Sequence, residues 1–243
     1  MNLPCKGRIL LPLVLALFLC PLQFPAKAAE SGALTDSDRA AGWKLIFDGK
    51  SLNGWRSYKA QDKPKPGWTV DDGILKKKKG VPGGDLMTVD TFGDFDLEWE
   101  WRVEPGGNNG VKYFITEERG SAIGHEYQMI DDEGHPDGRM GAHRTTASFY
   151  DVLPPDPKKP LNPPGQWNRS RVLVQGNHVE HWLNGKKVLE YELGSPAVMA
   201  AVQQSKFKSV KGFGTKVRGH ILLTDHQDEC WFRQIKIREL EAK

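Results

Sequence analysis

Cysteine is scarce in this sequence: its 243 residues include only Cys5, Cys20 and Cys230. The first two lie in an N-terminal segment that we expect to be removed, so the mature chain would keep one cysteine. A single cysteine excludes an intramolecular disulfide and a structural zinc site built on cysteines. The fold must therefore be held by its hydrophobic core, and a chain of about 200 residues can build one.

No apolar run is long enough to span a bilayer comfortably. The longest, residues 9–19, follows Lys6 and Arg8 and precedes the small residues of "AKA", which end at Ala28. This pattern is typical of a secretory signal peptide, and we expect residues 1–28 to be cleaved and the protein to be periplasmic or secreted. Lipidation at Cys20 is less favoured because "LFLC" lacks a small residue before the cysteine; a retained anchor is the third alternative.

A strong excess of one charge is also missing. The formal net charge is +3, and the predicted signal contains Lys6, Arg8 and Lys27 but no acid. The mature chain would therefore be formally neutral. A polyanion-binding surface of the usual basic kind is therefore not implied, and we expect no nucleic-acid partner and, after cleavage, no membrane association.

Several catalytic motifs are absent. The sequence contains no G-x-S-x-G, no P-loop and no dinucleotide fingerprint, so hydroxyl-nucleophile and nucleotide chemistry have no support. Its seven histidines include no H-x-x-x-H pair. His178 and His181 have odd spacing on a predicted hairpin and would point to opposite faces, so a zinc centre is not expected.

Short alternating segments dominate what is present. In residues 94–104, Phe95, Leu97 and Trp99 alternate with acids, as in a strand with one buried face. Asp72-Gly73 and Asn184-Gly185 predict tight hairpins. The one predicted helix is 195–207, which Pro196 would open. Further strands are expected in the following segments: 43–49, 68–80, 110–117, 125–132, 170–193, 219–226 and 230–240.

These roughly ten strands predict an all-β fold, a jelly-roll sandwich of two antiparallel sheets. After the signal we expect a polar lead over 29–41 and a single β-sandwich domain over 42–243. Most of the eight tryptophans should fill the core, with one or two facing a cleft. The run Lys76–Lys79 is interpreted as a solvated hairpin arm, and the six prolines of 153–167 predict a stiff surface loop.

The segment "IGHEYQMIDDEGHPD" (123–137) is the densest in chemically active side chains. If "HEYQMI" is a strand, Glu126 and Gln128 share one face and His125, Tyr127 and Met129 the other. The aromatic and the thioether suit the core, which leaves Glu126 and Gln128 on the open face. A carboxylate beside a carboxamide suits a sugar and supplies a general base; an ordinary polar outer face is the alternative.

The sequence suggests two further kinds of site, an acidic loop and clusters of polar residues. The acidic stretch 131–138 has oxygen ligands of the kind that calcium binds, but not EF-hand spacing, and solvated acidic loops are common. Polar residues also gather around Arg144 and Asp151, and at Asp225 and His226, where a predicted strand ends. Strand ends are frequent binding positions, although Asp225 could equally be a turn residue bonded to its own backbone.

Seven ordered blocks resemble the family first catalogued as DUF1080, described as 3-keto-disaccharide hydrolase or as 3-keto-glucoside lyase and 3-keto-glucal hydratase. The likeness covers residues 42–240. It rests on "GWKLIFDGKSLNGW", "GGDLMTVDTFGDFDLEWEWRV", "GGNNGVKYF", "HEYQMIDD", "GQWNRSRVLVQGNHVEHWLNGKKVLEYE", "GHILLTDH" and "WFRQIKIREL". The resemblance implies a concanavalin A-like jelly roll and an enzyme that cleaves the glycosidic bond of 3-keto sugars.

The family's site residues fall on particular positions here. Its E-x-Q corresponds to Glu126 and Gln128, and its D-H before the last strand to Asp225 and His226. Its R…S-x-Y-D loop corresponds to Arg144, Ser148, Tyr150 and Asp151. One departure is visible: the usual glycine after the histidine is Gln227, which puts the orientation of His226 in question.

A C3 ketone acidifies the proton on C2, so a base can remove it and the C1 substituent can leave by β-elimination; water addition then completes a net hydrolysis. For this chemistry we expect His226 or Glu126 as the base. Arg144 or a bound divalent cation, calcium or another, would stabilise the oxyanion. The expected sugar contacts are Gln128, Asp151, Lys112, Asp225, Tyr113, Trp101 and Trp182. A 3-keto substrate also implies a separate sugar 3-oxidoreductase as pathway partner.

Three alternatives stay open. A non-catalytic, lectin-like carbohydrate-binding module could use the same fold, because fold does not fix function. A conventional glycosidase would need a second carboxylate near Glu126, with Asp151 or Asp225 as candidates. A purely structural surface protein is least favoured, given the polar groups at the predicted strand ends.

Overall fold

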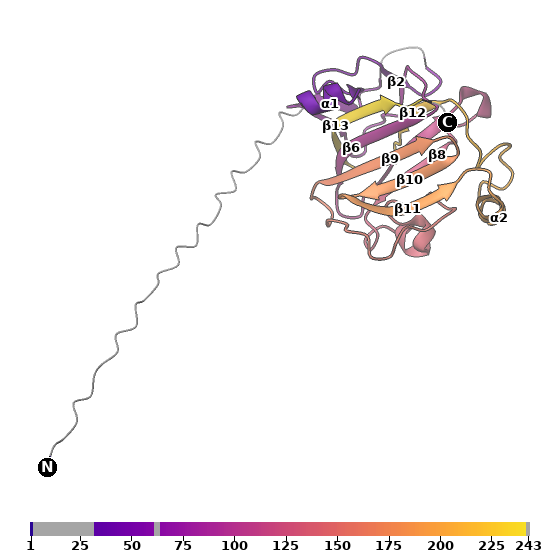
Figure 1. The fold of residues 1–243 in the computed structure, drawn as a ribbon. Helices are drawn as coiled ribbons and strands as arrows, with labels where there is room; N and C mark the ends of the chain where they lie inside the picture. The colour runs from indigo at the N-terminus through magenta and orange to yellow at the C-terminus, as the bar shows by residue number, and fades with distance from the viewer. Residues whose placement is uncertain (2–31, 61–63, 242–243) are drawn as a thin grey trace.

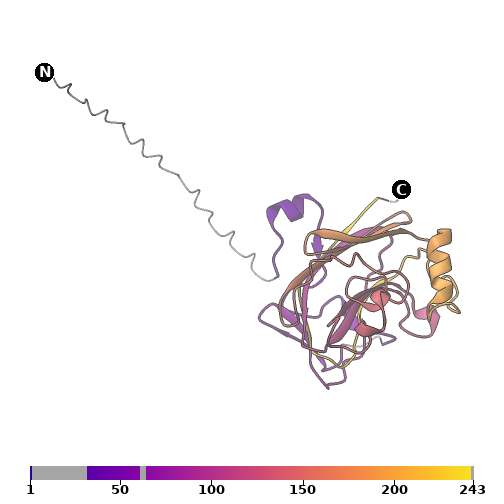
Figure 2. The ribbon, with the colours of Figure 1, turned by 90° about the horizontal axis from the view of Figure 1, so that it is seen from below.

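The computed structural model describes residue 1 and residues 32–60 and 64–241, which form two antiparallel sheets packed face to face (Figures 1 and 2). The predicted signal peptide lies outside the described residues. No helix among the described residues is long and apolar enough to cross a membrane. The all-β jelly-roll sandwich expected from the sequence is confirmed.

The larger sheet, called sheet A here, has eight strands. Their spatial order is β11 (Lys186–Glu192), β10 (His178–Leu183), β9 (Asn168–Gln175), β6 (Phe95–Val103), β13 (Cys230–Glu239), β4 (Ile74–Lys77) and β3 (Trp68–Asp71); β1 (Lys44–Leu45) pairs with β13. Sheet B has five strands, β2 (Trp55–Ser57), β5 (Leu86–Thr88), β12 (His220–Leu223), β7 (Asn108–Ile115) and β8 (His125–Ile130).

Helices are few and short. α1 (Asp36–Ala40) lies in the predicted polar lead, and a capping box at Thr35 caps its N-terminus. α2 (Pro196–Gln204) has Ser195 as N-cap and Pro196 in its first turn, as predicted, and stands at one side of the sandwich in Figure 2. Three single-turn 3₁₀ helices cover Glu117–Arg119, Gly138–Met140 and Ala142–Arg144.

The core lies between the sheets and is rich in aromatic side chains. Trp55, Trp68, Trp99 and Trp101 are buried in it. The other four tryptophans, at 43, 167, 182 and 231, are only partly buried. More tryptophans than expected therefore reach the surface.

The interpretation of Lys76–Lys79 as a solvated arm is wrong for Lys77. This side chain is fully buried, and its Nζ lies 2.9 Å from Asp225 Oδ1 and donates to the carbonyls of Lys78 and Val81. The reason is strand alternation: Lys77 shares the inner face of β4 with Leu75, and its charge is paired inside the sandwich.

Candidate functional site

Glu126 ends a row of side chains that crosses sheet B. The strand registers place Arg56, Met87, Leu222, Lys112 and Glu126 opposite one another on five successive strands. Their sequence neighbours Leu223, Val111 and Tyr127 belong to the main core, whereas Met87 and Leu222 form a separate cluster. The row therefore lies on the outer face of sheet B, the face on which alternation predicted Glu126.

The Glu126 carboxylate lies directly over the backbone of Gly110 on the neighbouring strand. A Cβ at Gly110 would be 2.1 Å from Glu126 Oε1, so only glycine leaves room for the carboxylate in this position. On the same strand, Lys112 Nζ lies 3.9 Å from Glu126 Oε2 and donates to the carbonyl of Ala122. The carboxylate thus lies between the backbone of Gly110 and the ammonium group of Lys112.

The outer face at β8 is covered rather than open. The backbone of residues 147–150 runs along the edge of β8, where Ala147 N–H donates to Gln128 O and Tyr150 N–H to Glu126 O. Glu126 is 5 % exposed and Gln128 1 %. The Gln128 side chain accepts a hydrogen bond from the Met129 N–H. Glu126 therefore keeps a small opening to solvent, whereas Gln128 is enclosed.

The loop along the edge of β8 brings a second carboxylate, Asp151. Its Oδ1 accepts from Arg144 Nε at 2.7 Å and lies 3.6 Å from His143 Nε2; its Oδ2 accepts from the Lys206 N–H at 2.7 Å. Asp151 adopts a left-handed φ of 62°, which aims its buried carboxylate at these partners. The loop after α2 is thereby fastened to the loop after β8.

Arg144 links Asp151 to a third carboxylate, Asp137. Arg144 Nη1 lies 2.6 Å from Asp137 Oδ1, and the Tyr150 hydroxyl donates to Asp137 Oδ2 at 2.7 Å. Burial alone would raise the pKa of Asp137, but these two hydrogen bonds hold it below its ordinary value. Burial, followed by the bond to Asp137, raises the pKa of the Tyr150 phenol. Arg144 therefore has both of its carboxylate partners inside the protein.

Lys206 is another cationic side chain of this cluster, and it differs from Arg144 in its partners. Among the described residues it makes no ion pair, and its Nζ lies 4.2 Å from the centre of the Tyr150 ring. The side chain reaches solvent along part of its length, yet packing around the ammonium lowers its pKa. Arg144 and Lys112 add to that lowering, and Glu126 and Asp151 oppose it. Lys206 is thus an electrostatic neighbour of Glu126.

The sequence did not predict Lys206 as a site residue, and it considered Asp137 only within the acidic loop. Both reach the cluster through loops whose approach no local pattern encodes. The Asp137–Arg144 spacing of seven residues could have suggested an ion pair, because both residues flank a short loop.

The remaining predicted residues lie elsewhere. Asp225 is directed into the sandwich, where it pairs with Lys77 and accepts the N–H groups of Gly83 and Gln227. His226, next in the chain, is exposed. Gln227 has a left-handed φ of 67°, the region that favours glycine.

Two of the aromatic residues expected to contact sugar are fully enclosed. The Tyr113 hydroxyl bonds to His181 and Tyr191 inside the core, and Trp101 is 1 % exposed, with its indole N–H donating to Ser170. Neither offers a ring face to solvent. Trp182 is partly buried and lies on the outer face of sheet A.

Two carboxylates of the acidic loop 131–137, those of Asp131 and Asp132, already have partners. Asp131 accepts backbone N–H groups of Gly106, Glu133 and Gly134, and Asp132 pairs with Lys159. In the described part of the chain, one group of three residues has metal-ligand spacing, His178, Glu180 and Glu190. Lys187 inserts its ammonium between those two glutamates, which opposes a cation there.

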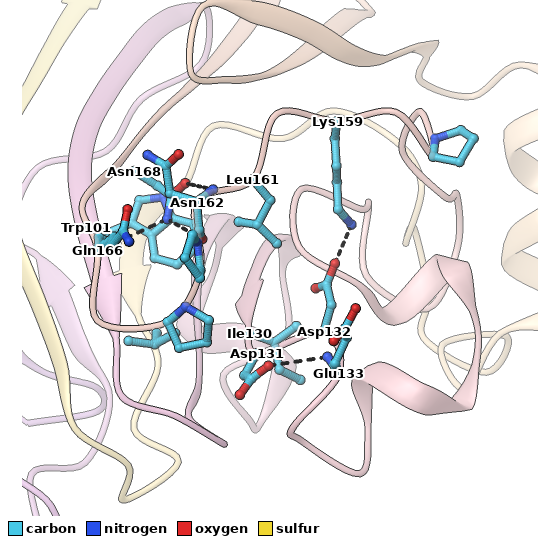
Figure 3. A pocket seen from close by; sticks show the side chains of 14 residues that line it. Trp101, Ile130, Asp131, Asp132, Glu133, Lys159, Leu161, Asn162, Gln166 and Asn168 are labelled. Atoms are coloured by element: carbon cyan, nitrogen blue, oxygen red, sulfur yellow. Dashed lines mark hydrogen bonds and ion pairs between the residues drawn. The ribbon is translucent and has the colours of Figure 1, made fainter.

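A separate cavity of about 350 Å³ opens under the proline-rich loop (Figure 3). Trp101, Val103 and Ile130 are part of its apolar lining. At its rim, Lys159 Nζ contacts Asp132 at 2.7 Å and donates to Thr145. This pair fastens the proline-rich loop to the loop that carries Arg144 and Asp151.

Comparison with known proteins identifies the family of this chain. Residues 42–238 match the model of the 3-keto-alpha-glucoside-1,2-lyase-like domain. The chain is 35 % identical over 246 aligned positions to a 3-keto-disaccharide hydrolase of Bacteroides thetaiotaomicron, covering 88 % of this chain and 84 % of that protein.

Solved structures are also similar. A candidate glycosyl hydrolase from Parabacteroides distasonis ATCC 8503 superposes with a TM-score of 0.79 at 30 % identity, covering 87 % of this chain and all of that one. A second protein of the same description and organism gives 0.66 at 27 % identity, covering 82 % and 99 %. This chain therefore belongs to the family of 3-keto-alpha-glucoside-1,2-lyase-like domains.

Proposed function

We propose that this protein cleaves the glycosidic bond of 3-keto-glycosides or 3-keto-disaccharides by β-elimination, with hydration of the product giving a net hydrolysis. The observation that carries this proposal is a nearly buried carboxylate, Glu126, that lies 3.9 Å from the Lys112 ammonium and interacts electrostatically with the Lys206 ammonium. The description of the Bacteroides relative as a 3-keto-disaccharide hydrolase, together with the description of the family, supports the same substrate class here.

Glu126 would act as the base. It takes the proton from C2, and the electron pair left behind forms an enediolate with the C3 oxygen. Lys112 and Lys206 stabilise the charge on that oxygen, because the one carboxylate near Lys112 is Glu126, which is neutralised when it takes the proton, and Lys206 makes no ion pair among the described residues. Arg144 is a weaker choice than the sequence suggested, since Asp137 and Asp151 already engage it.

His143 is placed to serve as the acid. The C3 ketone re-forms as the C1–O bond breaks, and the leaving oxygen takes a proton. His143 is partly exposed, and its Nε2 lies 3.6 Å from the Asp151 carboxylate. Water then adds at C1 and a proton returns to C2. We assign the base to Glu126 rather than His226, because His226 follows a residue anchored to Lys77 at an exposed turn.

A conventional glycosidase is less well supported. It would need a second carboxylate available near Glu126, and Asp137, Asp151 and Asp225 are all engaged by basic side chains. A divalent cation is also disfavoured at this site, because the cationic side chains of Lys112, Arg144 and Lys206 lie among its carboxylates. Our proposed route therefore has no step that depends on a metal.

The substrate chemistry places the reaction in a sequence. A 3-keto-glycoside must first be made by an oxidoreductase acting on C3 of the sugar, so we propose such an enzyme as the pathway partner. We further propose export through residues 1–28. The N-terminal sequence of the protein recovered from a periplasmic or culture fraction tests this, since a start at Ala29 is expected and a retained Met1 would contradict it.

Exchange of the C2 proton tests the assignment of Glu126. In deuterated buffer the wild type should incorporate deuterium at C2 of a 3-keto-glucoside or its products. Glu126→Gln should slow both incorporation and aglycone release by about 10²- to 10⁴-fold. His226→Ala is the control and should retain both. Full activity of Glu126→Gln, or loss confined to His226→Ala, would contradict the assignment.

A further inference from the structure

The outer face of sheet A carries two adjoining depressions. One, of about 410 Å³, lies between the segment before α1 and strands β6 and β13; the other, of about 420 Å³, lies between β9 and the end of β10. Glu98 and Arg169 line both. The two together form a groove, called the sheet A groove here, across the strands that face the viewer in Figure 1.

The charges in the sheet A groove are already paired. Arg169 and Lys236 both contact Glu98, Arg233 contacts Glu100 at 2.6 Å, and Lys236 contacts Asp38 at 2.6 Å. An anionic polymer would have to displace these carboxylates, so the groove is not built for a polyanion. The paired groups instead present fixed donors beside fixed acceptors, the arrangement that sugar hydroxyls need because each can donate and accept.

Partly buried tryptophans flank the groove. Trp182 lines its β10 end, 5.3 Å from the Arg171 guanidinium, and donates its indole N–H to Glu180. Trp167 lines neither depression, but its ring centre lies 4.1 Å from the guanidinium of Arg233, which lines the depression beside β13. A pyranose ring has an apolar face that packs on an indole while its equatorial hydroxyls reach polar neighbours.

We propose that the sheet A groove binds a neutral oligosaccharide chain without cleaving it. The site is distinct from Glu126, which lies on the outer face of the opposite sheet, and no residue is shared between them. Trp182 would supply the stacking surface, and the Glu98–Arg169 pair would bind hydroxyls. This binding does not depend on the function proposed above.

Affinity electrophoresis tests the groove. The wild type should be retarded in native gels containing at least one neutral polysaccharide among laminarin, hydroxyethyl cellulose and soluble starch. Trp182→Ala should weaken that binding by about tenfold or more, as removal of an aromatic anchor usually does. Trp231→Ala is the matched control, because Trp231 lies on the same sheet face but lines neither depression.

Further variants make the result unambiguous. Arg169→Gln should also weaken retardation, which protects the test against misfolding of Trp182→Ala. Glu126→Gln should bind as well as the wild type, and Trp182→Ala should still cleave a small 3-keto-glucoside. No retardation by any neutral polysaccharide, equal loss in Trp231→Ala, or retardation only by dextran sulfate would overturn the proposal.

Discussion

Lys206 shows at the scale of one residue how position sets a role. Its ammonium is close enough to Glu126 and Asp151 to interact with both, yet it forms an ion pair with neither. Lys206→Met should lower kcat by roughly 10²-fold while KM changes less, because the charge is used mainly as the oxyanion forms. Lys208→Met, two residues along on an exposed position, is the control.

Steady-state kinetics on a 3-keto-glucoside provide the measurement. Partial recovery by Lys206→Arg is expected, because the charge returns with a different shape. A rise in KM with unchanged kcat would show that Lys206 only binds substrate.

Asp225 was predicted to contact the substrate, but its pairing with Lys77 indicates a role in the stability of the fold. Its partner Lys77 is fully buried, so Asp225→Ala leaves an uncompensated charge inside the sandwich and should cost about 3–5 kcal/mol of unfolding free energy. Activity per folded molecule should be retained. Urea unfolding and active-site-normalised kcat distinguish the two roles: unchanged stability with a large loss of kcat would restore Asp225 as a substrate contact.

At the scale of elements, β7 leaves room for the Glu126 carboxylate because Gly110 has no side chain. Gly110→Ala would put a Cβ against Glu126 Oε1, and the flexible end of the glutamate can move aside. We expect a loss of activity with a stability change below about 1.5 kcal/mol. Gly93→Ala, whose Cβ would meet only the Arg218 side chain, is the matched control. Normal activity in Gly110→Ala would show that the carboxylate position seen here is not required.

Local signals explain which elements could be predicted. The hairpin residues Asp72 and Asn184 have φ values of 45° and 46° and are followed by left-handed glycines. The Asp-Gly and Asn-Gly pairs therefore predicted the turns, although they did not predict how the strands pair in the sheet. β2 and β5 were missed because each has three residues, too few to show a period. A run of four lysines concealed the alternation that buries Lys77.

The sequence predicted the position of site residues only where they lie on a single strand, β8. Alternation on β8 placed Glu126 and Gln128 on the outer face, but gave no sign that residues 147–150 pair with the edge of β8 or that both side chains are buried. β7 adds a further departure: Phe114 has a left-handed φ of 60°, and both Tyr113 and Phe114 pack inward with ring centres 5.1 Å apart. Bulges and long-range loop contacts of this kind depend on tertiary packing, which no single segment records.

At the scale of the whole molecule, two buried histidines couple stability to pH. Burial lowers the pKa of His125 to about 3 and that of His181 to about 4. The unfolded chain protonates both near pH 6.5, so it binds more protons than the folded protein between that pH and about 4. Stability should therefore fall as the pH drops below 6.5, by about 1.4 kcal/mol per pH unit for each histidine.

Urea unfolding between pH 7.5 and 5 measures this slope. His125→Phe should remove about half of it, because His125 sits among aromatic rings and its Nδ1 has no hydrogen-bond partner among the described residues. A flat stability profile over this range in the wild type would show that these histidines do not set it.

The most direct test of the account compares a 3-keto-glucoside with its unoxidised parent as substrates for the mature protein, with and without chelator. We predict aglycone release from the keto substrate alone, unaffected by chelator, because the C3 ketone is what makes the C2 proton removable by Glu126. Equal release from both substrates would contradict the elimination mechanism and identify a conventional glycosidase, and release from neither would leave a carbohydrate-binding protein.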